Sequence, residues 1–204
     1  LHFTESLLEK LSAKNIHTAF VTLHVGAGTF KPVKATVMQD HEMHAEYIDV
    51  SLESIQKIRQ ALSHPIITVG TTSLRTVESL YWLGKKVIDQ PDIETKDLSV
   101  DQWDPYEHNS DLPSADKALA ALEHYLIDRK LYRLVTKTRI IIAPGYSFKI
   151  IKGLITNFHQ PQSTLLLLVA AITGDDWKKI YQYALDHDFR FLSYGDGSLL
   201  WNRS

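Results

Sequence analysis

The sequence predicts an α/β fold with a mixed or mostly parallel sheet, open or barrel-like, flanked by helices. Two observations predict it. Short runs rich in β-branched residues alternate with helical patterns along most of the chain, which is typical of strands joined by covering helices. Several of these runs stop at a glycine or polar turn that leads directly into a helix start, as strand, turn, helix units do.

The first half of the chain contains three predicted strands and three predicted helices. Thr4 caps the first helix, and the first strand ends in the turn Gly26-Ala27-Gly28. Ser51 caps the second helix, and Gly70 separates the third strand from the third helix. The expected strands are 16–25, 44–50 and 66–69, and the expected helices are the segments after Thr4 and after Ser51 and the segment 72–83.

The second half begins with an acidic, irregular segment at about 85–114, which we interpret as a surface insertion. Alanine and leucine content predicts a helix at 115–127, and helical patterns also begin at about 163 and at Asp175. The remaining strands are expected at 140–143 and 148–156, on either side of the turn at Pro144-Gly145-Tyr146, and at 190–193.

The composition bounds the class of protein. With 204 residues, 44% of them hydrophobic, the chain can bury one main core. It has no cysteine, which excludes a thiolate nucleophile, a thiolate metal site and disulfides, and a cytoplasmic protein is expected. The longest apolar run, 165–172, is shorter than the roughly 18 residues that span a bilayer, so no membrane insertion is expected. Because the chain begins at Leu1 without a signal-peptide pattern, we expect it to be cut from a longer protein.

The formal net charge of -2 argues against a protein that coats nucleic acid through bulk positive charge. One basic cluster with no acid among its members remains. It is either a local RNA contact or a solvated helix end and strand edge. Its members are Arg129, Lys130, Arg133, Lys137 and Arg139.

Four loops are expected at the carboxyl ends of strands, where ligands of α/β proteins gather. Gly70 permits a tight turn, and the following helix start offers free amide groups beside three hydroxyl side chains, a combination suited to a carboxylate or phosphate. Capping of the helix by Thr72 is the competing interpretation. Gly26 and Gly28 permit a ligand to lie against bare backbone, but without the spacing of a dinucleotide fingerprint. The four loops are 24–30, 70–75, 156–159 and 193–196.

His41, His44 and Glu46 suggest a metal site, but the helical zinc motif requires histidines four residues apart, and these are three apart. In an extended segment, His44 and Glu46 share one face while His41 points away. Proton transfer or hydrogen bonding to sugar hydroxyls is therefore expected, with a half-buried structural pair as the competing interpretation. Asn157 and His159, after a predicted strand, have the same two interpretations.

Several long motifs follow one another in the chain. They are Leu1-His-Phe-Thr4, Val21-Thr-Leu-His-Val-Gly-Ala-Gly-Thr-Phe30, His41-Glu-Met-His-Ala-Glu46, Val69-Gly-Thr-Thr-Ser-Leu-Arg-Thr-Val-Glu-Ser79, Pro144-Gly-Tyr-Ser-Phe148, Leu154-Ile-Thr-Asn-Phe-His159, Ser163-Thr-Leu165 and Phe191-Leu-Ser-Tyr-Gly-Asp196. Taken together, they resemble the signatures of the S-adenosylmethionine:tRNA ribosyltransferase-isomerases of queuosine synthesis. The resemblance covers most of the chain apart from 85–137.

The resemblance implies that residues 1–204 form one α/β catalytic domain, lacking the family's separate β-barrel domain. It implies transfer and isomerisation of the ribosyl moiety of S-adenosylmethionine onto 7-aminomethyl-7-deazaguanine in tRNA. Epoxyqueuosine would form, and adenine and methionine would be released. The implied cosubstrate is S-adenosylmethionine, no metal is expected, and the implied partner is a tRNA anticodon loop that carries a 7-deazaguanine.

The resemblance also directs the choice of site residues. We expect His44 with Glu46 to handle a proton or contact the ribose, and His159 with Asn157 to act as the partner pair across the site. The remaining candidates bind the cosubstrate through backbone, hydroxyl groups or charge, with Arg75 on a carboxylate or an RNA phosphate. They are His24, Gly26, Gly28, Thr29, Thr71, Thr72, Ser73, Arg75 and Asp196.

Three aromatic residues, Tyr146, Phe148 and Phe158, are either platforms for a base extruded from the RNA loop or part of the core. Two other functions also remain open. A nonenzymatic nucleoside- or RNA-binding relative would release no adenine from S-adenosylmethionine. A metal-dependent hydrolase using His41, His44 and Glu46 would contain zinc or manganese when purified.

Overall fold

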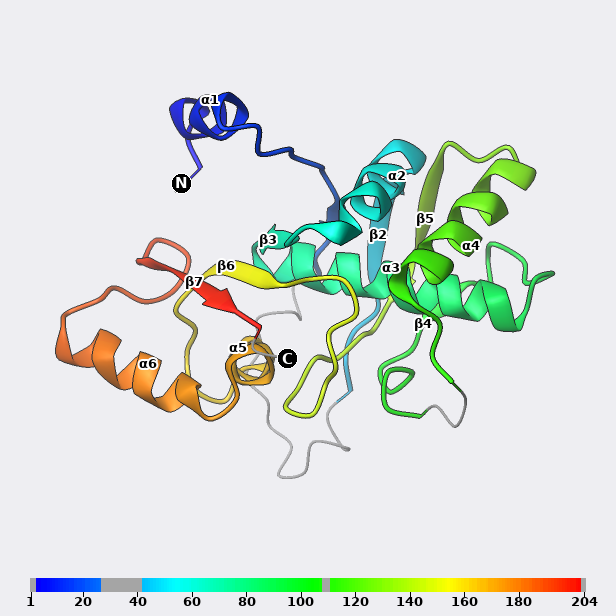
Figure 1. Ribbon diagram of the computed structural model, residues 1–204. Coiled ribbons are helices and arrows are strands. Elements are labelled where there is room, and N and C mark those ends of the chain that lie inside the picture. The colour runs from blue at the N-terminus through cyan, green and yellow to red at the C-terminus, as the bar shows by residue number, and fades with distance from the viewer. Residues whose placement is uncertain (1–2, 27–41, 108–110, 203–204) are drawn as a thin grey trace.

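The structure is a computed structural model that describes residues 3–26, 42–107 and 111–202. It contains two mixed β-sheets with helices packed beside them (Figure 1). The predicted α/β class is therefore confirmed, and the sheets are mixed rather than mostly parallel. The strands divide between two sheets, and neither sheet closes into a barrel within the described ranges.

The larger sheet has four strands in the order β1-β2-β5-β4. β2 runs antiparallel to both β1 and β5, whereas β4 runs parallel to β5. Side chains alternate between buried and exposed along β2 and β5, because successive residues of a strand point to opposite faces. The strand bounds are Thr22–His24 for β1, Glu46–Ser51 for β2, Ser99–Val100 for β4 and Arg133–Thr138 for β5.

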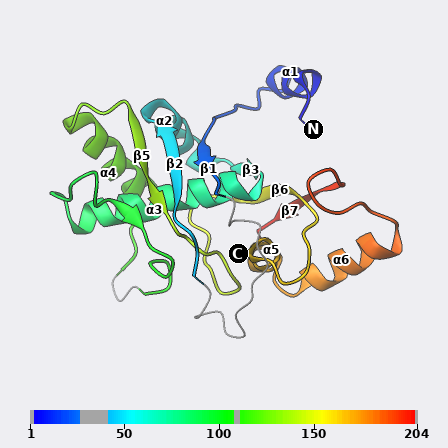
Figure 2. The ribbon, with the colours of Figure 1, turned by 180° about the vertical axis from the view of Figure 1, so that it is seen from behind.

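Three helices pack on one face of this sheet, and Figure 2 shows the molecule from the opposite side. Ile48 and Leu134 of the sheet belong to one apolar cluster with Leu80 and Leu122 of the helices, all fully buried. Burial of this cluster is the main source of stability for this half of the molecule. The helices are α2 (Leu52–Gln60), followed by the short 3-10 turn η2 (Ala61–Ser63), α3 (Thr71–Asp89) and α4 (Ala115–Asp128).

The smaller sheet has three strands in the order β3-β6-β7. β3 is parallel to β6, and β6 is antiparallel to β7. Two helices follow β6, and the first of them begins after the Ser163 cap, whose hydroxyl accepts from the Leu166 N–H at 3.2 Å. The elements are β3 (Ile67–Val69), β6 (Gly153–Asn157), α5 (Thr164–Thr173), α6 (Asp176–Asp186) and β7 (Gly197–Trp201).

Three predicted strands are wrong in position. The apolar run 140–143 is buried but forms no strand. The neighbouring strand is β5, whose alternation of exposed and buried residues is the period-2 signal. A continuous apolar run predicts burial, not strand pairing. The segment 190–193 is a turn, so the last strand is β7 instead, and of the predicted strand 16–25 only β1 is formed.

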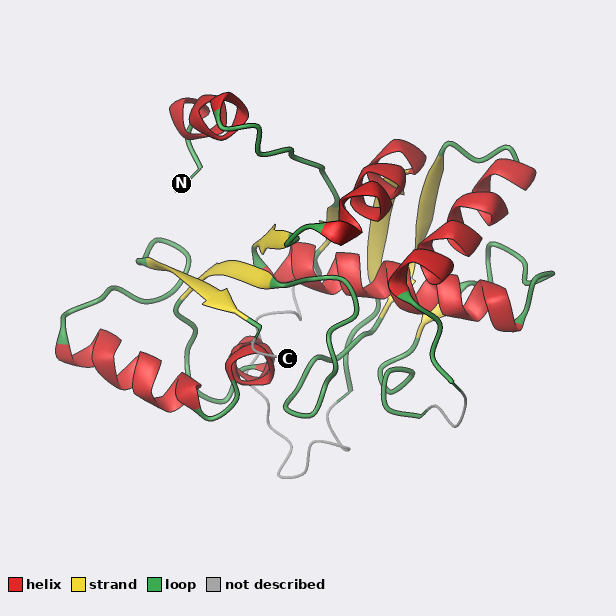
Figure 3. Cartoon of the chain, viewed as in Figure 1, coloured by secondary structure: helices red, strands yellow, loops and turns green. Residues whose placement is uncertain are grey.

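The segment predicted as an irregular insertion at 85–114 begins later than expected. α3 continues to Asp89 because Val87, four residues after Leu83, extends its buried face. Apart from β4, the described residues between α3 and α4 are loop (Figure 3). Leu98 and Val100 are buried in the main core, so the segment contributes to the core as well as to the surface.

The first helix, α1 (Glu5–Ala13), is capped by Thr4 as predicted and has no buried residue. It lies apart from both sheets at the end of an extended segment (Figure 1). Within the described ranges, no helix is both long enough and apolar enough to cross a membrane.

Candidate functional site

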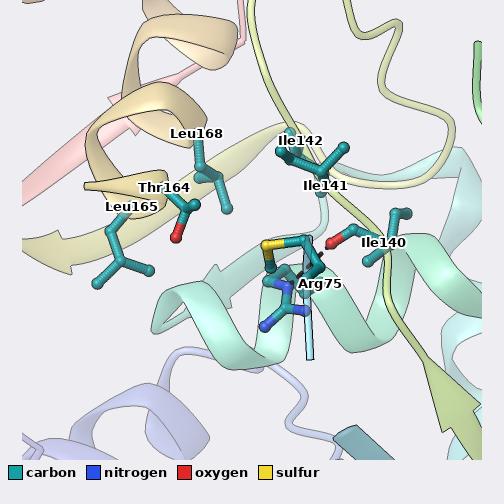
Figure 4. A pocket seen from close by; sticks show the side chains of 8 residues that line it. Arg75, Ile140, Ile141, Ile142, Thr164, Leu165 and Leu168 are labelled. Atoms are coloured by element: carbon teal, nitrogen blue, oxygen red, sulfur yellow. Dashed lines mark hydrogen bonds between the residues drawn. The ribbon is translucent and has the colours of Figure 1, made fainter. Parts of the chain in front are cut away.

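A small pocket lies where three of the sequence motifs meet. Its wall is formed by the segment before β2, the second turn of α3, the first turns of α5 and the buried run after β5. In Figure 4 the residues of α5 lie on one side and the isoleucines on the other, with Arg75 between them. The lining residues are Met43, Arg75, Ile140, Ile141, Ile142, Thr164, Leu165 and Leu168.

The polar centre of this pocket is a buried ion pair. Nη1 of Arg75 donates to the Glu46 carboxylate, and Nε donates to the Ile140 carbonyl oxygen at 3.3 Å. The Arg75 and Glu46 side chains are only 6% and 2% exposed. Within the described ranges, Nη2 of Arg75 is buried and has no hydrogen-bond partner. The guanidinium is therefore held in place with one donor group still available.

His44 and Glu46 do not lie on one face, although they were expected to. β2 begins only at Glu46, so the strand alternation does not include His44. His44 is exposed, while Glu46 is buried against Arg75. Met43 lines the pocket, and its backbone N–H donates to Oε1 of Gln102 at 2.7 Å. His44 thus follows directly after a residue that lines the pocket.

The turn before α3 is formed by Gly70, as the sequence predicts. Gly70 adopts φ +90, which favours glycine, and its N–H donates to the Ile155 carbonyl oxygen at 2.8 Å. Gly70 is the N-cap residue, so no side chain caps the helix and the interpretation of Thr72 as the cap is wrong. Thr71 is buried, and Thr72 and Ser73 are half-buried.

His159 and Asn157 follow β6 but have different surroundings. Nε2 of His159 lies 3.0 Å from the Thr156 hydroxyl. The backbone N–H of His159 donates to the Tyr181 hydroxyl at 2.9 Å. Burial lowers the pKa of His159 to about 4, so its imidazole is neutral at neutral pH. Nδ2 of Asn157 donates to the carbonyl oxygens of Gly195 at 3.1 Å and Asp196 at 3.3 Å.

Asp196 stabilises the loop before β7 through contacts with Arg190. Its carboxylate accepts from the Arg190 N–H at 2.8 Å and from Nη2 of Arg190 at 3.0 Å. Asn157 and Asp196 are thus brought together at one end of the smaller sheet, while Arg75 and Glu46 meet at the pocket. His24 and Gly26 are exposed at the end of β1, and the candidates Gly28 and Thr29 lie outside the described residues, as does His41.

Sequence reasoning missed Glu78, which is completely buried. Its carboxylate accepts from the Tyr146 hydroxyl at 2.7 Å and from the N–H groups of Lys149, Ile150 and Ile151 at 2.9, 3.0 and 3.0 Å. Burial raises the pKa of Glu78, and the four donors act against that shift. Two signals were present, its place in the motif Val69–Ser79 and its position four residues after Leu74 on the buried face of α3.

The aromatic and basic candidates are mostly engaged within the protein. Tyr146 and Phe158 are buried and belong to the core, whereas Phe148 is half-buried. In the basic cluster, Arg133 pairs with Asp49 at 2.8 Å and Arg139 with Asp101 at 3.2 Å. Lys137 lies 5.3 Å from the centre of the Tyr47 ring. Among the described residues, no group of three or more histidine, aspartate and glutamate side chains is arranged to hold a metal ion.

Fold and pocket together define an α/β protein with a small pocket built at helix starts around a buried arginine. The family model for the queuosine biosynthesis protein matches residues 1–200. The chain therefore belongs to the queuosine biosynthesis protein family, as the sequence resemblance predicted.

Individual relatives agree with this assignment. The S-adenosylmethionine:tRNA ribosyltransferase-isomerase of Rickettsia prowazekii (strain Madrid E) is 35% identical over 206 residues, covering 100% of this chain and 42% of that protein. The protein of the same name from Herminiimonas arsenicoxydans is 38% identical over 203 residues, covering 98% of this chain and 46% of that protein. The chain thus spans less than half the length of these curated relatives.

A solved structure is similar as well. The crystal structure of the S-adenosylmethionine tRNA ribosyltransferase from Thermotoga maritima matches with a TM-score of 0.59 and 29% sequence identity. The match covers 97% of this chain and 50% of that one.

Proposed function

We propose that this chain forms part of an S-adenosylmethionine-dependent tRNA ribosyltransferase-isomerase and contributes residues to its site. The reaction moves the ribosyl moiety of S-adenosylmethionine onto the aminomethyl group of a 7-deazaguanine in tRNA, giving epoxyqueuosine, adenine and methionine. The observation that carries the proposal is the buried Arg75–Glu46 pair, which lies at a pocket formed by three of the family motifs.

The cosubstrate supplies much of its own activation. The positive sulfonium raises the acidity of the hydrogens on the adjacent 5′ carbon. It also makes methionine a competent leaving group. The protein must then supply a positioned base, a donor for the departing adenine and a site that excludes water. His44 is our candidate for the base because its side chain is exposed and it follows directly after the pocket residue Met43.

The second histidine suits a different role. Since the pKa of His159 is about 4, its ring is neutral near pH 7 and serves as a hydrogen-bonding group rather than a cation. We assign it, with Asn157, to the far side of the bound nucleoside. In this proposal the partner is the tRNA anticodon loop, and no metal takes part.

Nucleoside analysis of the product tests the proposal. The protein is incubated with S-adenosylmethionine and with tRNA that carries 7-aminomethyl-7-deazaguanine, and the digested tRNA is examined by mass spectrometry. The expected product is epoxyqueuosine. Bound S-adenosylmethionine without any new nucleoside would instead indicate a binding protein of the same fold.

A further inference from the structure

We infer that the pocket beside Arg75 binds a single hydroxyl group of the cosubstrate ribose, with Nη2 of Arg75 as donor and Thr164 as the second partner. This inference rests on the proposed function, because it assumes that S-adenosylmethionine occupies the site. It adds which chemical group of the nucleoside enters the pocket and which residues select it.

The three donor nitrogens of Arg75 differ in whether they have a hydrogen-bond acceptor. Nη1 and Nε are occupied by Glu46 and by the Ile140 carbonyl, while Nη2 lacks a partner within the described ranges. The side chain is 6% exposed, so bulk water does not compensate for the missing acceptor. A buried donor without an acceptor is unfavourable, and a ligand oxygen that accepts from Nη2 would remove this penalty.

The charge of Glu46 decides which kind of acceptor suits Nη2 of Arg75. Glu46 already neutralises Arg75, since the two side chains form a buried pair. A carboxylate or phosphate on Nη2 would bring a second negative charge close to Glu46 and would lose its own hydration in an apolar site. A neutral oxygen acceptor avoids both costs. The pair therefore favours a hydroxyl over the methionine carboxylate or an RNA phosphate.

The pocket beside Arg75 is small and mostly apolar. The cavity has a volume of about 10 Å³, close to the space required by one water-sized group. A carboxylate could place only one of its two oxygens in this space. Thr164 is the lining residue that carries a side-chain hydroxyl, and the lining residues other than Arg75 and Thr164 are apolar. A ribose hydroxyl can accept from Nη2 and donate to the Thr164 oxygen, so both of its hydrogen-bonding capacities are used.

The position of the pocket connects this contact to the chemistry. Met43 lines the pocket and His44 follows it in the chain. A ribose anchored by one hydroxyl beside Arg75 would therefore lie near the segment that carries the proposed base. In this arrangement Glu46 is a positioning residue, because it holds the guanidinium that holds the sugar.

Titration calorimetry with substrate analogues tests the inference. The ligands are S-adenosylmethionine, its 2′-deoxy and 3′-deoxy analogues and its decarboxylated analogue. Wild-type protein is expected to bind one deoxy analogue at least about tenfold more weakly than S-adenosylmethionine, the effect of one lost hydrogen bond to a charged donor. In Arg75→Lys, which retains the charge next to Glu46 but has no Nη2, the same deoxy penalty should fall below about twofold.

A second variant keeps the inference testable if Arg75→Lys does not fold. Thr164→Val preserves the shape of the side chain and should also reduce the deoxy penalty, while Thr95→Val, which removes a hydroxyl that lies 3.2 Å from Tyr125, serves as the matched control. Equal binding of both deoxy analogues and S-adenosylmethionine to wild-type protein would overturn the inference. It would also be overturned if the effect of Arg75→Lys vanished only with the decarboxylated analogue, because the carboxylate would then occupy the pocket.

The calorimetry distinguishes failure of the proposed function from failure of the ribose contact. If folded wild-type protein binds no S-adenosylmethionine, both the proposed function and the ribose contact are wrong. If it binds S-adenosylmethionine without distinguishing the deoxy analogues, only the ribose contact is wrong.

Discussion

At the scale of single residues, the Arg75–Glu46 pair has two roles, since it joins α3 to β2 and also lines the pocket. Removing one member of a buried pair leaves an uncompensated charge, which costs about 3–5 kcal/mol. We therefore expect Glu46→Gln to lower the free energy of unfolding by about that amount. Urea denaturation measures it.

The control for this variant is an exposed ion pair. Glu53 and Lys57 on α2 are 2.7 Å apart, but their side chains are 74% and 54% exposed. Glu53→Gln should change stability by less than about 1 kcal/mol. Similar losses for Glu46→Gln and Glu53→Gln would contradict the importance given to the buried pair.

His159 predicts a specific pH dependence of stability. Its pKa is about 4 in the folded protein, below the ordinary value of 6.5, so between these values the unfolded chain binds a proton that the native protein does not. The stability that it contributes is complete above pH 6.5 and is lost as the pH falls to 4, by on the order of 2–3 kcal/mol.

Urea unfolding at pH 7 and pH 5 tests this. The decrease in stability between the two values should be smaller in His159→Gln than in wild-type protein, whereas the exposed His124→Gln on α4 should behave as wild type. An unchanged pH dependence in His159→Gln would show that its imidazole is not held neutral.

His44 is the residue on which the proposed proton transfer depends. His44 is exposed, so His44→Ala should leave urea unfolding within about 0.5 kcal/mol of wild type. Adenine release from S-adenosylmethionine in the presence of the tRNA substrate should fall by at least about a hundredfold. His124→Ala provides the matched exposed control. Full activity in a folded His44→Ala protein would remove the assignment.

At the scale of elements, α3 and α4 approach each other closely at Gly84. A Cβ atom added there would lie 2.1 Å from the Ala118 carbonyl oxygen, which is a backbone atom and cannot turn away. Gly84→Ala is therefore expected to cost about 3 kcal/mol of stability. Gly197→Ala on β7, where the nearest atom is 3.8 Å away, should cost less than about 1 kcal/mol. Thermal or urea unfolding compares them, and equal effects would contradict this packing.

Helices were predicted from the sequence more accurately than strands, for a physical reason. A helix carries local signals, and Thr4, Ser51 and Ser163 each accept a hydrogen bond at the helix start that they were expected to begin. Strand pairing depends on distant partners. The run 140–143 is apolar because it passes through the core, whereas β5 pairs with β2 and β4 although every second residue of it is exposed.

At the scale of the whole molecule, the sequence predicted the α/β class but not its division into two sheets. β3 and β6 are parallel partners, but β2 pairs with β5 rather than with β3, and such a choice depends on long-range packing. Met43, Arg75 and Thr164 come from three separate sequence motifs, and they line one pocket, although the motif around Thr164 was not among the loops expected to gather there. The pairing of Glu46 with Arg75, instead of with His44, required knowledge of where β2 begins.

The central claim is that this chain participates in transferring the sugar of S-adenosylmethionine to tRNA. The most direct measurement uses S-adenosylmethionine labelled in its ribose, incubated with the protein and with tRNA that carries 7-aminomethyl-7-deazaguanine. The account predicts that label enters the tRNA and that adenine appears in an equal amount. Label that stays in S-adenosylmethionine, with the protein folded and the tRNA intact, would contradict it.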